Sequence, residues 1–333
     1  DYNMNSVGTG PYKLVDYQSG SYLKFEANEN YYKGEPSIKN VVFQIIENAD
    51  TAILALQNGE VDAYQMTPQQ VKKLDLDASN LSTYSYSEGR VGYLEINCNR
   101  VTDEKVRKAL LYAMDRKAMD DAAFESSEYY SIPYTFLPTN SQFYTEDGVE
   151  KYEQDVDKAK SMLEDAGVSG LKLKLGYMSS DAVQSAQALL IQEQLKEVGV
   201  TVELAGGDGT AIANAMKDPD NEYDMYLGGY IMGIDPDTFS SLFENDGAYN
   251  YMHYSGYDTI DQLFEEGRSE LDESARKETY AKLQAAVQDT GAFYPIISNN
   301  KILVVNNRIQ GVEDAGLVPV YTFEDTSSLK IAE

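Results

Sequence analysis

The spacing of apolar side chains between residues 155 and 204 changes several times, and each spacing predicts a different helix or strand. Apolar residues first recur at the period of an amphipathic helix, up to Gly167, and then alternate with polar ones, which is the period of a half-buried strand. A long segment without Gly or Pro follows and carries two apolar stripes. The predicted elements are a helix over 155–167, a strand over 171–177, a helix over 179–198 and a strand over 200–204. Strand, helix and strand in this order predict a right-handed βαβ unit.

The rest of the chain alternates shorter strands and helices. Strands are predicted over 12–17, 22–27, 41–46, 61–64, 81–86, 91–97, 223–229, 293–297 and 301–306, and helices over 48–58, from 68, and over 102–114, 258–270 and 273–289. Residues 129–147 show no clear period and are too long for an ordinary connection, so we expect a functional loop or a crossing between lobes. The pattern as a whole predicts an α/β protein with mixed or parallel sheets flanked by helices.

The charge of the chain narrows the choice of partners. Its 55 acidic residues outnumber 27 lysines and arginines, which leaves a net charge of −28. A field of this sign repels phosphate backbones, so we expect no nucleic-acid partner. The charge fits either solubility alone or a cationic or peptide-like ligand. The 27 tyrosines and the absence of tryptophan add side chains with an apolar body and a polar tip, which suit sheets and adaptable pockets alike.

The sequence contains few residues that suit catalysis or metal binding. His253 is the single histidine, and no nucleophile turn lies near it. Cys98 is the single cysteine, which excludes an internal disulfide and a thiolate metal cluster. Asp235 and Asp237 are a possible pair of oxygen ligands, but turn and capping roles are favoured for Asp-Pro-Asp. We therefore expect a protein that is not an enzyme and that carries no metal or cofactor.

A series of short motifs follows in order along most of the chain. They are GTGPY at 8–12, NYYKG at 30–34, ALQNGEVD at 55–62, IN at 96–97, VRKAL at 106–110 with MDR at 114–116, the segments 159–167 and 195–202, DPD at 235–237 and Pro295. With these motifs the chain resembles the extracytoplasmic solute-binding proteins of ABC transporters, of the family 5 type that carries oligopeptides, dipeptides or nickel. The resemblance implies a two-lobed, type II periplasmic-binding-protein-like fold, in which the lobes close on a ligand between them.

The resemblance also implies an organisation and a set of partners. Family members begin with a further block of chain, so we expect the N-terminal third to be missing here. Lobe one then comprises the later part at 1–118 together with 306–333, and lobe two comprises 119–305. The implied protein is a monomer that delivers a peptide-like or other small solute to the membrane subunits of an ABC permease. It works outside the cytoplasm, as a cell-surface lipoprotein or in the periplasm.

Three other functions stay open. One is a receptor for a non-peptide solute such as an oligosaccharide or a metal chelate. Another is a solute receptor that serves signalling or adhesion. A secreted glycan hydrolase is the least favoured, and it stays open only because 55 acidic residues make accidental carboxylate pairs inevitable.

The resemblance suggests ligand contacts on one loop. In the peptide-binding branch an Asp three residues before Asp-Pro-Asp pairs with the ligand's α-amine, and this sequence has Met232 there. Gly229 replaces the usual aromatic residue, although Tyr230 is adjacent, so the amine clamp is not carried over. Asp235 is expected either to supply the charge from a shifted loop or to form a structural turn. The full set of candidate contacts is Tyr230, Met232, Asp235, Tyr251, His253, Tyr254 and Tyr32.

Alternatives remain for the last four residues of this set. Tyr251, His253 and Tyr254, with Tyr249, suit stacking on a sugar or clasping a peptide backbone, but packing at a sheet edge is favoured. Tyr32, like Asn97 and Arg107, matches a family position whose expected role is structural.

Overall fold

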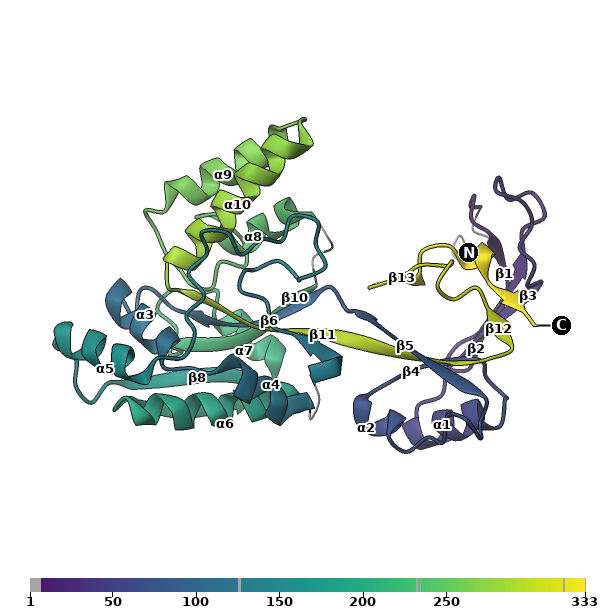
Figure 1. Ribbon diagram of the computed structural model, residues 1–333, viewed down its shortest axis with the longest axis horizontal. Helices are drawn as coiled ribbons and strands as arrows, with labels where there is room; N and C mark the ends of the chain where they lie inside the picture. The colour runs from purple at the N-terminus through teal and green to yellow at the C-terminus, as the bar shows by residue number, and fades with distance from the viewer. Residues whose placement is uncertain (1–6, 125–126, 232, 234, 320, 333) are drawn as a thin grey trace. The chain divides into compact units, whose positions relative to one another are not determined.

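The computed structural model describes residues 7–124, 127–231, 233, 235–319 and 321–332. The chain forms two compact units, Asp1–Glu88 with Asn300–Glu333, and Gly89–Asn299 (Figure 1). This division differs from the lobes expected at 1–118 with 306–333 and at 119–305. Residues 90–96 pair with strands of the second unit, and residues between 94 and 112 belong to one of its hydrophobic cores.

The first unit contains an antiparallel sheet of β1 (Tyr12–Gln18), β2 (Tyr22–Ala27) and β3 (Asn40–Gln44), with Gly20 at a positive φ of 71° in the first turn. A second group of strands is formed by β4 (Ala63–Met66), β5 (Leu81–Ser87) and the end of β11 (Phe293–Asn306). The unit also holds α1 (Ala49–Gln57), α2 (Pro68–Val71), and the short strands β12 (Ile309–Gln310), β13 (Leu317–Val318), β14 (Thr322–Phe323) and β15 (Lys330–Ile331). The two strands predicted over 293–297 and 301–306 are therefore one continuous strand.

The second unit is built on a mixed sheet in the order β11, β6 (Arg90–Ile96), β10 (Met225–Ile231), β8 (Lys172–Met178), β9 (Thr201–Gly207). Strands β8 and β9 are parallel and joined by α6 (Ala182–Glu197), so the predicted βαβ unit is confirmed. Strand β10 runs parallel to β8 and antiparallel to β6, which in turn is antiparallel to β11. The mixed sheet flanked by helices agrees with the expected fold class.

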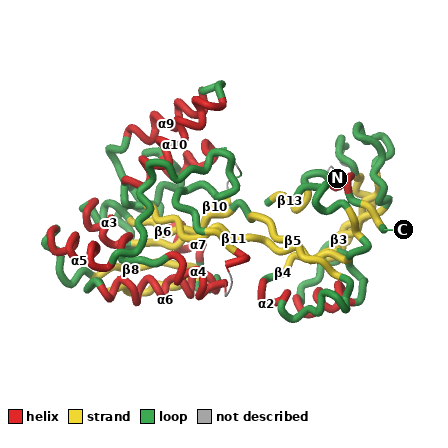
Figure 2. Tube along the Cα trace, in the orientation of Figure 1, coloured by secondary structure: helices red, strands yellow, loops and turns green. Residues whose placement is uncertain are grey.

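Two hydrophobic cores cover the two faces of this sheet. Leu94 and Ile96 of β6 belong to the core formed with α3 (Glu104–Tyr112), α4 (Arg116–Phe124), α5 (Val156–Asp165) and α6. Val91 and Tyr93 belong to the core formed with α9 (Asp258–Ser269) and α10 (Glu273–Asp289). Side chains of a strand alternate between its faces, so neighbouring residues of β6 enter different cores. The two helix layers are seen on opposite sides of β6 and β10 in Figure 1 and as red segments flanking yellow strands in Figure 2.

Residues 129–147, expected to form a functional loop or a crossing between lobes, lie within the second unit. After η1 (Ser127–Tyr129) and β7 (Tyr130–Ser131) the segment enters the core beneath α10, where Phe136 and Leu137 are fully buried. The side chain of Gln284 on α10 holds it by donating to the Phe143 carbonyl and accepting from the Thr135 hydroxyl. Tertiary contacts thus replace the regular backbone pattern whose absence suggested a functional loop.

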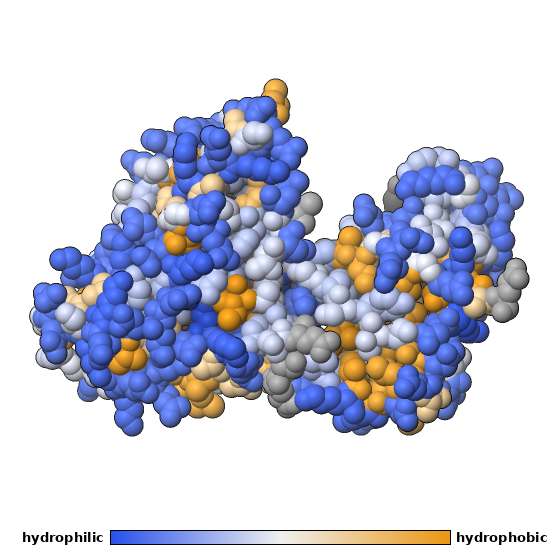
Figure 3. Space-filling view, viewed as in Figure 1, coloured by the Kyte–Doolittle hydropathy of each residue, from blue (hydrophilic) through white to orange (hydrophobic). Residues whose placement is uncertain are grey.

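The described helices are all too short or too polar to cross a membrane. On the face of the molecule shown in Figure 3, hydrophilic side chains predominate and apolar ones form small patches.

Candidate functional site

A row of four tyrosines lies on one face of the sheet in the second unit. Tyr226 and Tyr230 alternate with Gly228 along β10, so all three share this face. Tyr249 and Tyr251 approach from the loop after α8 (Ser240–Phe243). The ring centroids are 6.1 Å apart for Tyr226 and Tyr251, 6.2 Å for Tyr251 and Tyr249, and 5.7 Å for Tyr249 and Tyr230. We call these four residues the tyrosine row; their tilted and edge-to-face rings are a favourable aromatic arrangement.

Two glycines of β10 let other side chains lie flat on the sheet. A Cβ at Gly228 would come within 2.6 Å of the Tyr93 ring, which fills the space between Tyr226 and Tyr230. On the opposite face a Cβ at Gly229 would overlap the Arg90 guanidinium at 2.0 Å. At Gly229 the Arg90 guanidinium therefore occupies the space that a side chain would take.

A pocket of about 440 Å³ opens beside the tyrosine row. Tyr251, His253 and Tyr254 line it, so the structure brings together three of the residues that the sequence suggested. The rest of the lining is mainly polar and includes Asn99, Lys217, Asn245, Asp246, Asn250 and Ser255. All of these residues belong to the second unit.

The three predicted residues of the pocket differ in what their side chains can still bind. Tyr254 is only 3% exposed and its hydroxyl donates to the Phe243 carbonyl, so its role is structural. His253 has a positive φ of 48°, and its Nε2 lies 2.6 Å from the Met216 carbonyl oxygen. Tyr251 is half-buried, and its hydroxyl has no hydrogen-bond partner in the described part of the chain; burial, chiefly, raises its pKa to about 12. Of the three, Tyr251 is the side chain with a free polar group.

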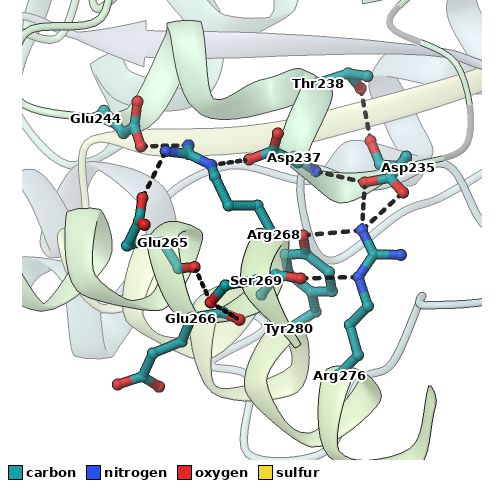
Figure 4. A network of polar contacts seen from close by, with 11 residues as sticks. Asp235, Asp237, Thr238, Glu244, Glu265, Glu266, Arg268, Ser269, Arg276 and Tyr280 are labelled. Carbon is teal, nitrogen blue, oxygen red and sulfur yellow. Dashed lines mark hydrogen bonds and ion pairs between the residues drawn. The ribbon is translucent and has the colours of Figure 1, made fainter. Parts of the chain in front are cut away.

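Asp235 is held in a network of ion pairs (Figure 4). Its carboxylate accepts from Arg276 Nη2 at 2.8 and 3.0 Å and from the backbone N–H of Asp237 at 3.0 Å, which caps η2 (Pro236–Phe239). Asp237 in turn pairs with Arg268 at 2.9 Å, and Arg268 also reaches Glu244 at 2.6 Å. A ligand amine would have to compete with Arg276 for Asp235. These contacts favour the structural turn over the shifted amine clamp.

The other predicted contacts are dispersed. Tyr230 is half-buried at one end of the tyrosine row. Met232 lies outside the described residues. Tyr32 belongs to the first unit, where it is 79% exposed and packs edge-on against Tyr31.

One acidic residue of the site was missed by the sequence reasoning. Glu95 of β6 is fully buried, and neither of its carboxylate oxygens has a hydrogen-bond partner among the described residues. Burial raises the pKa of Glu95 well above its usual range. The signal that could have found it is a single acidic residue within the otherwise apolar run 91–96.

The chemistry that the described residues offer is binding. No group of three or more His, Cys, Asp or Glu side chains among them is placed to hold a metal ion. Burial raises the pKa of the Cys98 thiol to about 11, which leaves the thiol form at neutral pH. Half-exposed tyrosines beside a polar pocket provide ring surfaces and hydroxyl groups for a small ligand.

Comparison with known proteins identifies similar chains. Residues 1–251 match the family described as bacterial extracellular solute-binding proteins, family 5 Middle. The solved structure of the ABC transporter substrate-binding protein CtaP from Listeria monocytogenes is 38% identical, with a TM-score of 0.93 over 100% of this chain and 68% of that chain. The structure of a putative peptide-binding protein AppA from Clostridium difficile is 33% identical, with a TM-score of 0.90 over 98% of this chain and 68% of that chain.

A curated relative is similar over most of this chain. The oligopeptide-binding protein AppA of Bacillus subtilis is 26% identical over 328 residues, which cover 90% of this chain and 58% of that protein. The chain thus spans less than two thirds of the length of this relative.

Proposed function

This chain belongs to the family 5 bacterial extracellular solute-binding proteins, and from this membership we propose that it captures a peptide-like solute for an ABC importer. The observation that carries the peptide assignment is the tyrosine row beside the polar pocket of the second unit. Tyrosine rings pack against apolar side chains and their hydroxyl groups bond to peptide groups, so they suit ligands that share a backbone and differ in side chain. The similar proteins named for oligopeptide and peptide binding support the same choice.

The proposed mechanism is non-covalent capture. Two lobes close on the solute, which binds the closed form in preference to the open one and so shifts the population toward it. The closed protein is then recognised by the membrane subunits of the permease. The chain itself performs no catalysis in this scheme, and it acts as a monomer outside the cytoplasm, either lipid-anchored at the cell surface or free in the periplasm.

The contacts of Asp235 limit which part of a peptide is recognised here. Its carboxylate is already paired with Arg276. The proposal therefore assigns no amine-binding role to Asp235 and assigns ligand contact to the exposed parts of Tyr230, Tyr249 and Tyr251.

Native mass spectrometry of the protein in its full natural length is the direct test. We expect a co-purified peptide, and we expect added peptides to raise the melting temperature. A ligand at 100 times its dissociation constant should stabilise the protein by about 2.7 kcal/mol. If oligosaccharides or metal chelates raise the melting temperature and peptides do not, the peptide assignment is wrong.

Variants connect this binding to the tyrosine row. Tyr249→Ala removes a ring that is 39% exposed, and should weaken peptide binding about tenfold because an aromatic contact contributes roughly 1 kcal/mol or more. Tyr17→Ala removes a tyrosine of similar exposure, 43%, from β1 and serves as the matched control. Equal affinity of the two variants would place the ligand elsewhere.

A further inference from the structure

The carboxyl group of Glu95 lies buried in the sheet under the tyrosine row. Glu95 pairs in register with Tyr226 on β10 and with Phe293 on β11, so it faces the same side as both. It is fully buried, and both oxygens lack a hydrogen-bond partner in the part of the chain that is described. Burying an ionised carboxylate without a partner is unfavourable, so the group is held as the neutral acid.

The surroundings of Glu95 are phenols rather than cations. Its carboxyl group lies within electrostatic range of the hydroxyl groups of Tyr93, Tyr226 and Tyr251. Within the described residues it forms no ion pair. Arg90 of the same strand lies against Gly229 on the other face of the sheet. The position therefore has an acid and several aromatic rings, and Arg90, the cation that acts on Tyr93 and Tyr226, is not paired with Glu95.

Tyr251 connects this acid to the open side of the unit. Its ring faces Tyr226 at 6.1 Å on the inner side, and the same residue lines the pocket of about 440 Å³. Tyr249, the next ring of the row, is 39% exposed. A group that displaced the Tyr251 ring from Tyr226 would enter between aromatic rings on the face of the sheet to which the Glu95 side chain belongs.

We propose that Glu95 and the tyrosine row form a subsite for a positively charged side chain of the ligand, the ammonium of lysine or the guanidinium of arginine. Aromatic faces attract cations, and a carboxylate without a partner supplies the matching charge. On binding, Glu95 loses its proton to the solvent and becomes the counter-ion of the ligand. The inference rests on the proposed capture of peptides and specifies the chemistry of one ligand side chain.

The proton released on binding should come from Glu95. The other titratable or charged groups that act on it or lie beside it are Tyr93 and Arg90 on β6, Tyr226 and Tyr230 on β10, and Tyr251 and Tyr254 on the following loop. Burial raises the pKa of each of these five phenols, so they keep their protons at neutral pH.

Titration calorimetry on the full-length protein tests the subsite. The probes are alanine tripeptides with one lysine at the first, second or third position, each compared with the peptide that has norleucine at the same position. At one of the three positions we expect the lysine peptide to bind at least tenfold more tightly. Repeating the titration in buffers of different ionisation enthalpy should show release of up to one proton for that peptide and none for its norleucine partner.

Two matched variants identify the carboxyl responsible. Glu95→Gln keeps the shape and removes the charge, so it should abolish both the preference and the proton release while the norleucine peptides still bind. Asp120→Asn neutralises another fully buried acid of the same unit, one that lies away from the tyrosine row on α4, and should leave both unchanged.

The outcomes separate this inference from the proposed function. If the norleucine and lysine peptides bind equally, or if Glu95→Gln keeps the preference, the cationic subsite is overturned while peptide capture stands. If no peptide of either kind binds, the proposed function fails, and the subsite fails with it.

Discussion

Replacing Asp120 by asparagine should make the protein more stable at alkaline pH, which is the opposite of what removing a charge from a surface ion pair does. Asp120 lies on α4, fully buried, and neither carboxylate oxygen has a hydrogen bond of ordinary geometry among the described residues. Burial raises its pKa from 3.8 to about 8, and the nearby side chains of Gln187 and Arg116 offset only part of the effect. The folded protein therefore favours the protonated acid.

The sign and size of the pH dependence follow from this shift. Because the folded pKa lies above the unfolded one, the contribution of Asp120 to stability is fully present below the unfolded pKa and is lost as pH rises through about 8. One pKa unit corresponds to about 1.4 kcal/mol, but relaxation around a buried charge reduces the realised cost. We expect the free energy of unfolding to fall by about 2 kcal/mol between pH 5 and pH 8 on account of this residue.

Urea unfolding followed by circular dichroism at pH 5, 6.5 and 8 measures the effect. The advantage of Asp120→Asn over the wild type in free energy of unfolding should be about 2 kcal/mol larger at pH 8 than at pH 5. Asp121→Asn is the control from the neighbouring position. Asp121 is exposed, and pairing with Lys117 and Tyr130 lowers its pKa, so its loss should cost stability above the unfolded pKa and not below it.

The reasoning about Asp120 would be refuted by a particular pattern. If Asp120→Asn destabilises the protein at pH 8, or differs from the wild type equally at all three pH values, Asp120 is ionised in the folded state. Comparing variants at each pH cancels the contribution of the other acidic residues.

Two further predictions concern the tyrosine row and the Asp235 network. Gly228→Ala should lower the free energy of unfolding by about 1–3 kcal/mol, because the new Cβ would lie 2.6 Å from the Tyr93 ring. The control, Gly10→Ala, should change it by less than about 0.5 kcal/mol, because no atom lies within 4 Å of the added Cβ. Equal thermal shifts for the two variants would show that the Tyr93 ring can move away. Arg276→Ala should lower the free energy of unfolding by about 1–2 kcal/mol, because it removes hydrogen bonds to Asp235 and to the Gly267 carbonyl. The control, Lys277→Ala, removes an exposed ion pair with Glu273 and should change it by no more than about 0.5 kcal/mol in the same melting assay. If the two variants do not differ, the Asp235 network has no role in stability.

Elements whose pattern is local were predictable from the sequence. The strands β8 and β9 with α6 between them appear where periodicity placed them, because alternation and helical spacing report burial within a few residues. The family assignment depended on the same kind of local information, since short motifs in order carried it. Strand β11 was also found, although as two pieces, because the polar Ser-Asn-Asn-Lys in its middle interrupts the apolar run.

The candidate site was only partly predictable for a physical reason. Tyr251, His253 and Tyr254 are neighbours in sequence, so their meeting at one pocket could be expected. Asp235 depends on Arg276, which lies 41 residues later, and no local pattern indicates that pairing. Glu95 was overlooked because a single acid in a strand reads as a solvent-facing residue until the neighbouring strands are placed.

The sequence by itself determined the class of fold, the βαβ unit and the family, because these depend on the periods of local segments and the order of short motifs. Only the tertiary structure decided which charges are paired. Arg276 neutralises Asp235, whereas Glu95 and Asp120 are buried without an ordinary hydrogen bond. Burial and pairing depend on residues brought together from distant parts of the chain, and the free energy of a charge depends on those neighbours more than on its own position in the sequence.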